Sequence, residues 1–488
     1  MQPYVLGLDI GTGSVKALAV DFSGNALRSK QYFYTTLQPS PGYQEQEPED
    51  VYNACLKGME QLIKEMGAVP VAVSFSCVMH SIMAVDKEGK PLSRVLLWSD
   101  ARSTKIAEEL RNTETGKALY RRCGTPIHSM SPLCKIIWFQ KNLPEIFSRT
   151  GKFISIKEYI WFRLFGEYAV DYSLASATGM FDIEKKSWDQ QALSLPGINV
   201  NQLSKPVNTS YTKQNVQDDA VRDIHISSQT LFCIGSSDGC LANLGTYALQ
   251  ENIAAITIGT SGAVRVASSK PIVNETSMTF NYLLDEKIYI SGGPVNNGGN
   301  ILDWLASSFF PGDEKKIEKV LQQIENTSEG SEGMIFLPYV HGERAPIWNE
   351  NASGVFFGVR PQHQLGHFLR AALEGVCFNL RQILELLEEE LKSVHSIHAS
   401  GGFIHSAAWI QMLADITGKN ICVWQTEDAS ALGAAFLVLK SMGQISDYQD
   451  LRRPEAKTTE PRKEYQEVYE KNYRNYCLLY PSVQNLMQ

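Results

Sequence analysis

The sequence predicts an α/β protein with two large domains, and three observations lead to this fold class. The chain has 488 residues, more than a single hydrophobic core usually serves. Apolar runs typical of strands alternate with stretches of helical periodicity. A strand, an Ile-Gly-Thr sequence and a second strand open the chain at 4–20 and recur at 252–268. The recurrence suggests an internal duplication, although a chance likeness of two hairpins is the alternative.

The first domain is expected to begin with a β-meander. Residues 4–10 form an apolar run that ends in a glycine turn, and a second apolar run follows before the turn sequence FSGN at 22–25. A strand-like segment comes next at 26–34, so the opening strand does not feed directly into a helix. Helical spacing covers 50–66, and the apolar segment 71–77 is expected to be a buried strand.

The second domain is expected to continue from its own hairpin into a glycine-rich helix entry at 292–300. A long helix is expected from about 364 to 392, followed by a strand, two glycines and another helix near 397–415. The join between the halves lies near 246–251, which gives domains at 1–246 and 247–488.

Composition narrows the classes of function. The chain is 43% hydrophobic and 20% charged, as in soluble globular proteins. Its net charge of −8 argues against a nucleic-acid partner, because phosphate neutralisation needs clustered basic residues. Nine scattered cysteines without a C-x-x-C sequence indicate reduced thiols. Neither a signal peptide nor a membrane-spanning run is recognisable. We expect a cytoplasmic protein without a membrane partner, for which a homodimer stays open.

Small residues follow the first strand at Gly11, Thr12, Gly13 and Ser14. In a hairpin turn, their backbone N–H groups and hydroxyls can approach phosphate oxygens, while Asp9 at the strand end can hold Mg²⁺ through water. A P-loop sequence does not occur, and a dinucleotide-binding fingerprint would need glycine at position 16. Taken alone, these residues are also compatible with an ordinary β-turn.

A partner turn occurs in the second half at Gly259, Thr260 and Ser261. Two facing turns could grip a polyphosphate from opposite sides, so the pair favours phosphate binding. Gly401 and Gly402 stand between a strand and a helix, where glycine lets the backbone approach a flat ligand such as adenine. Simple loop chemistry explains these two glycines equally well.

Asp238 follows the apolar segment 230–234 within the sequence Gly-Ser-Ser-Asp-Gly. An aspartate held by small residues at the end of a buried strand can orient a hydroxyl and accept its proton during phosphoryl transfer. A frequent Asp-Gly turn is the alternative interpretation of the same residues.

Together these motifs resemble the FGGY family of carbohydrate kinases along nearly the whole chain. The most specific stretch is Gly354-Val-Phe-Phe-Gly358-Val359, followed after seven residues by His367-Phe-Leu-Arg-Ala-Ala-Leu-Glu374. It fits the C-terminal signature of the family, and the other motifs occur in the family's order. The resemblance implies two actin-like, ribonuclease H-like ATPase lobes with an interlobe catalytic cleft.

The resemblance also implies ATP and Mg²⁺ as cofactors. It assigns Asp238 as the catalytic base that contacts the substrate hydroxyl, and it places Asp9 near the metal. The two turns would hold the phosphates, and Gly401 and Gly402 would lie beside the adenosine. The resemblance implies that residues 1–246 bind the sugar and residues 247–488 bind ATP. The signature helix is expected to be structural.

The substrate is expected to be a small sugar or sugar acid bound by the first lobe. Met79 and His80 follow the strand at 71–77, while Asp100 and Arg102 belong to a W-x-D-x-R sequence. A polyol suits such a set because it offers several donors and acceptors. The resemblance implies that His80 and Asp100 hydrogen-bond hydroxyls, as their counterparts do in pentulose kinases. The tryptophan of the sequence is expected to be a core residue.

Three stretches are similar to gluconate kinases within the family, and they favour ATP-dependent phosphorylation of the terminal hydroxyl of D-gluconate to give 6-phosphogluconate. They lie at 124–133, 237–245 and 337–348. A sugar acid adds a carboxylate that needs Arg or Lys, for which Arg102, Lys135 and Arg344 are candidates. Phosphorylation of D-xylulose is the nearest alternative, and an actin-like ATPase without kinase activity is a more distant one.

Overall fold

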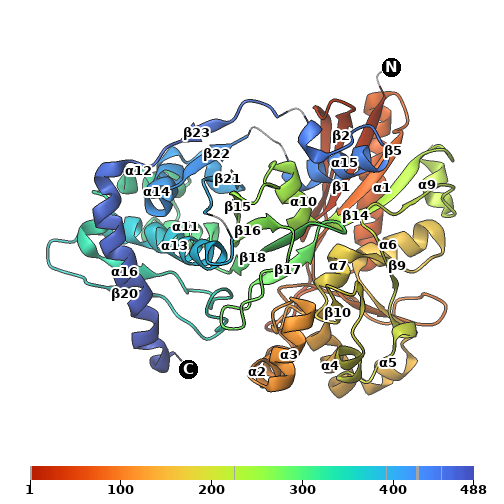
Figure 1. The fold of residues 1–488 in the computed structure, drawn as a ribbon, viewed down its shortest axis with the longest axis horizontal. Helices are drawn as coiled ribbons and strands as arrows, with labels where there is room; N and C mark the ends of the chain where they lie inside the picture. The colour runs from red at the N-terminus through yellow and green to blue at the C-terminus, as the bar shows by residue number, and fades with distance from the viewer. Residues whose placement is uncertain (1–2, 225, 392, 425–427, 452, 488) are drawn as a thin grey trace. The chain divides into compact units, whose positions relative to one another are not determined.

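The computed structural model describes residues 3–487 apart from 225, 392, 425–427 and 452. The chain forms two compact units, which Figure 1 shows with the chain coloured from red to blue. The first unit consists of Met1–Tyr247, Ser268–Ile290 and Thr426–Arg453, and the second of Ala248–Ala267, Ser291–Gln425 and Pro454–Gln488. Each unit thus combines segments that are distant in the sequence. The expected two-domain α/β organisation is confirmed, whereas the roles given to the two halves stay predictions.

The first unit contains a six-stranded sheet in the order β13-β14-β5-β1-β2-β3. Its strands are β1 (Tyr4–Ile10), β2 (Ser14–Asp21), β3 (Ala26–Phe33), β5 (Ala72–Cys77), β13 (Thr212–Lys213) and β14 (Leu231–Ser237). Strands β1, β5 and β14 run parallel to one another. The pairs β1/β2 and β2/β3 are antiparallel, so the expected β-meander is present. Because parallel strands end at the same edge of a sheet, the candidate residues at the ends of β1, β5 and β14 lie along one edge.

Helix α1 (Pro48–Met66) covers one face of this sheet. It begins with Pro48 in its first turn, where a missing N–H costs nothing, and has Glu49 and Asp50 beside it. It ends at Gly67, whose left-handed φ of 64° closes the helix. The expected helix at 50–66 is therefore confirmed.

Helix α15 (Ala429–Ser441) lies beside β1 and β5 (Figure 1). It approaches so closely that a Cβ on Gly7 would lie 1.9 Å from the carbonyl oxygen of Ala431. A Cβ on Gly245, in the neighbouring helix α10 (Asp238–Gly245), would lie equally close to the Ala429 carbonyl oxygen. Small residues are thus required where α15, β1 and α10 meet.

The remaining elements of the first unit lie outside this sheet. Its short strands are β4 (Glu45–Gln46), β6 (Met83–Val85), β7 (Val95–Leu96), β8 (Lys152–Ile154), β9 (Ala169–Asp171), β10 (Phe181–Asp182), β11 (Ser187–Trp188), β12 (Lys205–Val207) and β17 (Phe280–Leu283). Its other helices are α2 (Thr104–Arg111), α3 (Glu114–Cys123), α4 (Pro132–Asn142), α5 (Pro144–Arg149), α6 (Ile156–Phe165), α7 (Tyr172–Ser176), α8 (Gln190–Ser194) and α9 (Asp219–Asp223).

The second unit contains a sheet in the order β18-β16-β15-β21-β22-β23. Its strands are β15 (Ile253–Ile258), β16 (Gly262–Ser268), β18 (Tyr289–Val295), β21 (Ser396–Ser400), β22 (Asn420–Val423) and β23 (Lys457–Thr459), with the separate pair β19 (Ile335–Leu337) and β20 (Val355–Phe357). Its helices are α11 (Gly299–Phe309), α12 (Lys316–Glu325), α13 (Leu365–Glu388), α14 (Ala407–Thr417) and α16 (Gln466–Val483). The expected hairpin at 252–268, the glycine-rich helix entry and the long helix are all confirmed.

The signature segment forms buried polar contacts in the second unit. The Arg370 guanidinium donates to Glu374 at 2.9 Å, and Glu374 accepts from the backbone N–H of Gly330 and the hydroxyl of Ser331.

All nine cysteines carry free thiols. In the described part of the chain, no helix combines the length and apolar character that spanning a membrane requires.

Candidate active site

Three neighbouring parallel strands of the first unit end at one edge of the sheet, and each is followed by, or ends in, a candidate residue. Asp9 lies near the end of β1 and pairs in register with Ser76 of β5. Met79 and His80 follow β5 after one intervening residue, and Asp238 comes directly after β14, whose Ser237 pairs with Cys77 of β5. The strand topology thus groups these candidates within the first unit.

A shift in the register of β14 precedes Asp238. The register of β14 against β5 shifts between Cys233 and Ser236, and Gly235 there has a left-handed φ of 71°. A Cβ on Gly235 would lie 1.8 Å from the Phe75 carbonyl oxygen, so only glycine fits. Helix α10 then begins at Asp238, whose side chain is half-buried. Its Oδ1 accepts from the Gly239 N–H at 2.8 Å.

A buried ion pair supports the strand end that carries Asp238. The Lys157 amine lies 2.6 Å from Asp171 Oδ2 and donates to the carbonyl oxygen of Ser236 at 3.0 Å. Ser173 adds a hydroxyl contact of 2.7 Å to Ser237. The two residues before Asp238 are therefore fixed by polar groups of other elements, which limits the positions that its carboxylate can take.

Asp9 is surrounded by negative charge. Burial raises its pKa well above the ordinary value, and the carboxylates of Asp428 and Asp238 raise it further. The Ser76 hydroxyl, which donates to Asp9 Oδ1 at 2.6 Å, and the Lys16 ammonium lower the pKa in return. A divalent cation would relieve the same repulsion, so the donor set suits a hard cation.

A direct metal cage is absent from the described residues, in which no group of three or more His, Cys, Asp and Glu side chains could hold an ion. Asp9 fits the alternative role expected from the sequence, a contact to Mg²⁺ through water, because Mg²⁺ usually keeps several waters.

Asp428 and Lys16 are further candidate site residues, which no sequence motif indicated. The Lys16 amine lies 2.9 Å from Asp428 Oδ2. Asp428 caps α15 by accepting from the Ala431 N–H at 2.9 Å. An aspartate before a run of small helix-forming residues is an N-cap signal, but it says nothing about the partner strand. The long sequence separation between the two residues hid their contact.

The first turn is braced by side chains. It closes through the Gly11 N–H on the Ser14 carbonyl oxygen at 3.0 Å. The Trp98 indole N–H donates to Thr12 Oγ1 at 3.0 Å, and the Gln46 amide donates to the Thr12 carbonyl oxygen. Gly13 is exposed, and a Cβ added there would have no atom within 4 Å. Trp98 is only partly buried, so its N–H supports a turn in addition to any packing role.

The second turn is braced by backbone. Its Gly259 N–H donates to the Ser261 carbonyl oxygen at 2.9 Å. At the entry to α11, the Gly299 N–H donates to the Gly259 carbonyl oxygen at 2.7 Å and the Asn300 N–H to that of Thr260 at 3.1 Å. Gly259 and Thr260 remain exposed, so their remaining polar groups are accessible to an anion.

Gly401 and Gly402 lie beside this second turn, because β21 runs parallel to β15 and Ser400 pairs with Thr257. Gly401 has a φ of 98°, and a Cβ there would lie 2.3 Å from the Ile258 carbonyl oxygen. Gly402 is exposed with open space around its Cα. The first glycine is thus required by the fold, whereas the second leaves room for a ligand.

His80 is held in an unusual conformation. Its φ is 64°, and its Nδ1 lies 2.8 Å from the Ala177 carbonyl oxygen, which can only accept, so Nδ1 carries the proton. In the neutral imidazole, Nε2 then accepts from the Tyr282 hydroxyl at 3.1 Å. Tyr282 belongs to β17 and was not anticipated from the sequence. Met79 is partly buried and packs on the core of the unit.

Asp100 and Arg102 form a closed polar cluster. Asp100 is fully buried, lies 2.8 Å from the Arg102 guanidinium and accepts from the Gln44 N–H at 2.7 Å. Arg102 also pairs with Glu45 at 2.6 Å and stacks on the Tyr43 ring at 3.9 Å. Both side chains therefore have protein partners in this structure.

The two other cations expected to be candidates for a carboxylate also have protein partners. The Lys135 amine donates to the backbone carbonyl oxygens of His80, Leu97 and Met130. Arg344, in the second unit, donates to the Val295 carbonyl oxygen at 2.9 Å. Its neighbour Glu343 accepts from the Arg344 backbone N–H, and burial raises the pKa of Glu343 to about 7.

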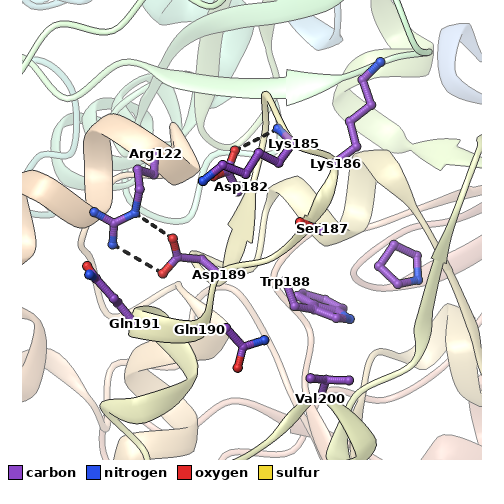
Figure 2. Close-up of a pocket in the computed structure, with 11 residues that line it drawn as sticks. Arg122, Asp182, Lys185, Lys186, Ser187, Trp188, Asp189, Gln190, Gln191 and Val200 are labelled. Carbon is purple, nitrogen blue, oxygen red and sulfur yellow. Dashed lines mark hydrogen bonds and ion pairs between the residues drawn. The ribbon is translucent and has the colours of Figure 1, made fainter.

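A pocket of about 650 Å³ lies elsewhere in the first unit, at the β10/β11 hairpin. Figure 2 shows Trp188 there, with Arg122 paired to Asp189 at 2.6 Å and Lys185 near Asp182. None of the expected site residues lines this pocket. The candidate active site is therefore defined by the strand ends and turns rather than by this cavity.

Comparisons with known proteins agree on one family. The model of the N-terminal domain of the FGGY family of carbohydrate kinases matches residues 4–245, and the model of the C-terminal domain of that family matches residues 254–442. A gluconokinase of Bacillus subtilis (strain 168) is 39% identical over 92% of this chain and 89% of that protein. A xylulose kinase of Staphylococcus epidermidis is 28% identical over 100% of this chain and 98% of that protein.

A solved structure shows the same fold. The crystal structure of gluconate kinase from Lactobacillus acidophilus superimposes with a TM-score of 0.95 at 31% identity. The match covers 99% of this chain and 98% of that one. The shared fold therefore extends over nearly the whole of this chain.

Proposed function

Because this chain belongs to the FGGY family of carbohydrate kinases, we propose that it phosphorylates the terminal hydroxyl of D-gluconate with ATP, giving 6-phosphogluconate and ADP. The family makes the protein a phosphotransferase that acts on a sugar or sugar acid. One observation carries the choice of gluconate, namely 39% identity to a gluconokinase against 28% to a xylulose kinase.

Asp238 is proposed as the general base. Its half-buried carboxylate stands at the start of α10, and the residues before it are anchored by Lys157 and Ser173. A carboxylate fixed in this way can orient the sugar hydroxyl and accept its proton as the oxygen attacks phosphorus. Its contact to the Gly239 N–H at 2.8 Å holds Oδ1 in a fixed position at the start of α10.

Asp9 is proposed to hold Mg²⁺ through water, with Lys16 and Asp428 setting the local charge. When bound, Mg²⁺ would neutralise charge on the phosphate oxygens. The Lys16 amine, 40% exposed at the side chain and paired with Asp428, adds a positive group beside the first turn. Ser76 keeps the Asp9 carboxylate in one orientation.

The two turns are proposed to bind the phosphates of ATP. In the first unit, Gly11 closes its turn through its own N–H, and Thr12, Gly13 and Ser14 offer backbone N–H groups and hydroxyls. In the second unit, Gly259 closes its turn in the same way, and Thr260 and Ser261 offer such groups. Exposure of Gly13, Gly259 and Thr260 supports this role. Gly401 and Gly402 are proposed to lie beside the adenosine, because open space adjoins Gly402.

Met79, His80, Asp100 and Arg102 are proposed to form the sugar side of the site. A sugar hydroxyl can engage His80 at Nε2 by competing with, or bridging to, the Tyr282 hydroxyl. The buried Asp100–Arg102 pair supports a role in fixing the loop that follows β7. D-Xylulose is the second candidate substrate, favoured by xylulose kinases among the relatives that match the whole chain.

A coupled assay of ADP release tests this proposal over gluconate, xylulose, ribulose and glycerol. We expect gluconate to give the highest kcat/KM, because recognition of a carboxylate or of several hydroxyls is worth at least about tenfold between related substrates. A clearly higher kcat/KM for xylulose would overturn gluconate as the substrate and leave the kinase activity intact. ADP release that does not respond to any sugar would contradict the kinase reaction itself.

A further inference from the structure

Lys135 is a lysine without solvent exposure on α4. Its amine donates to the backbone carbonyl oxygens of His80 at 3.1 Å, Leu97 at 2.5 Å and Met130 at 2.9 Å. An ammonium group has three N–H donors, and these three acceptors match that number. The carbonyls come from three loops that are separate in the sequence.

Each of these loops carries or adjoins residues proposed for the site. His80 is itself a proposed sugar contact. Leu97 precedes Trp98, whose indole N–H supports the first phosphate turn at Thr12. Met130 lies within one of the stretches that resemble gluconate kinases. One cation therefore connects all three loops at the level of their backbones.

Burial of a charged amine at this position is energetically unfavourable. Removing an ammonium from water costs free energy that an apolar side chain of similar length would avoid. Asp100 acts on the amine electrostatically, yet its carboxylate pairs directly with Arg102. The directional hydrogen bonds to the three loops are what a methionine at this position could not provide.

We propose that Lys135 is a positioning residue for the sugar, whose ammonium holds the loops at His80, Leu97 and Met130 in the arrangement that binds substrate. This inference rests on the sugar-kinase function proposed above. It replaces the expectation that Lys135 contacts a substrate carboxylate, because its donors are already used by the protein.

Protonation of Lys135 then controls sugar binding. Burial lowers the pKa of Lys135 to about 7, with Arg102 lowering it further and Asp100 and Cys134 raising it. A neutral amine keeps two N–H donors, so one of the three carbonyls loses its partner as pH rises above about 7. We therefore expect the KM for the sugar to rise with pH in this range.

Other titratable groups near the three loops have defined partners. The His80 imidazole contacts Ala177 and Tyr282, and His128 Nδ1 accepts from the Met130 N–H at 3.1 Å. Histidine side chains in general gain a proton in mildly acidic solution, whereas a lysine amine loses one toward alkaline pH. A weakening that grows toward alkaline pH therefore points to Lys135.

The contribution of Lys135 to the stability of the fold depends on pH in the opposite direction to its effect on sugar binding. The folded-state pKa of Lys135 lies below its ordinary value of 10.5. The contribution of this group to stability is therefore present above that value and is lost as pH falls through about 7. As pH rises, the contribution of Lys135 to the free energy of unfolding should thus increase while sugar binding weakens. A purely structural lysine would show only the first effect.

Lys135→Met and Lys135→Arg test the proposal, with Ile136→Ala as the control on the same helix. Ile136 is fully buried, so its truncation weakens packing without removing a donor to the loops. KM for sugar, KM for ATP, kcat and thermal stability would be measured from about pH 6 to about pH 9. Lys135→Met is expected to raise the sugar KM about 10- to 100-fold, because misplaced contacts cost this much.

The other readouts separate positioning from folding. KM for ATP should stay within about twofold in Lys135→Met. Ile136→Ala should lower the melting temperature without the same rise in sugar KM. Lys135→Arg, which stays charged throughout, should abolish the alkaline rise in sugar KM that the unmodified enzyme shows.

Several results would overturn the proposal. These are an unchanged sugar KM in Lys135→Met, an equal rise in Ile136→Ala, or a sugar KM of the unmodified enzyme that is flat at alkaline pH. If Lys135→Met does not fold, the pH profiles of the unmodified enzyme and Lys135→Arg decide. Absence of sugar-dependent ADP release in the unmodified enzyme would instead refute the proposed function, and the role of Lys135 with it.

Discussion

The two glycine-threonine turns share a local sequence but differ in the charge around them. Before the first turn, Asp9 lies next to the last residue of β1; burial and the carboxylates of Asp428 and Asp238 raise its pKa, and Lys16 lowers it. At the matching place before the second turn stands Thr257, whose hydroxyl lies 2.9 Å from Ser400 Oγ and accepts from Arg265 at 3.1 Å. The start of the first turn is therefore surrounded by carboxylates, and the matching place before the second turn by hydroxyls and a cation.

The two turns also differ in what holds them. Side chains of Trp98 and Gln46 brace the first turn, whereas backbone N–H groups of Gly299 and Asn300 brace the second. Side-chain bracing links the first turn to the loop that carries Asp100, a proposed sugar residue. The difference agrees with the proposed roles, in which the residues for proton transfer and metal binding lie in the first unit.

Replacement of Asp238 by asparagine should give the largest effect on this division. The variant keeps the shape of the side chain but cannot accept a proton, so sugar-dependent turnover should fall about 10²- to 10⁴-fold. ATP binding, measured by calorimetry, should stay nearly unchanged. Asp50→Asn, at an exposed position in the first turn of α1, serves as the control. Near-normal turnover of Asp238→Asn would remove this residue from the role of base.

Asp9→Asn should have the next largest effect and should separate activity from stability. Loss of a positioned charge should lower kcat about 10²-fold. The raised pKa of Asp9 means that its contribution to stability is present at low pH and is lost as pH rises through the folded-state pKa. The variant removes that loss and keeps an oxygen for Ser76. Its melting temperature should exceed that of the unmodified protein at neutral pH, and the gap should close in acid.

Calorimetric melting at several pH values, together with a titration of Mg²⁺ in the kinase assay, checks this prediction. A variant that is both active and less stable than the unmodified protein would contradict the charge crowding inferred around Asp9.

The adjacent glycines of the second unit offer a smaller and more selective test. Gly402→Ala meets no atom within 4 Å, so the fold should be unaffected while the KM for ATP rises about tenfold if adenosine packs there. Gly401→Ala should instead destabilise the protein by about 1–3 kcal/mol, because its φ of 98° is strained for other residues. Unchanged ATP kinetics in Gly402→Ala would remove this glycine from the nucleotide site.

The smallest effect is expected for the brace on the first turn. Trp98→Phe deletes the N–H that reaches Thr12, and one such hydrogen bond is worth about 0.5–1.5 kcal/mol. A double-mutant cycle with Thr12→Val should recover a coupling of that size in kcat/KM. Additive effects of the two substitutions would show that the contact does not link the turn to the sugar side.

Local features of the fold were predictable because their signals are local. Apolar periodicity gave α1 and α13, and glycine at turns gave the two hairpins. The contacts between distant segments were not predictable. Asp428 returns to the first unit late in the chain, and Tyr282 reaches His80 from β17. No spacing in a single sequence reports such pairs.

The candidate site shows the same limit. The residue types at Asp9, Asp238 and the turns pointed to phosphate chemistry without any structure. Sequence could not tell that Arg102 is closed off by Asp100 and Glu45, because an arginine in an ion pair and one facing a ligand look alike in a single chain. Burial of Lys135 was hidden for the same reason.

Product analysis of a reaction with ATP and D-gluconate tests the central claim most directly. Phosphorus NMR with mass spectrometry should show a new phosphate monoester on the terminal carbon of gluconate, formed in equal amount to ADP and lost in Asp238→Asn. ADP accompanied by free inorganic phosphate, or a phosphate ester that forms from xylulose and not from gluconate, would contradict the proposed reaction.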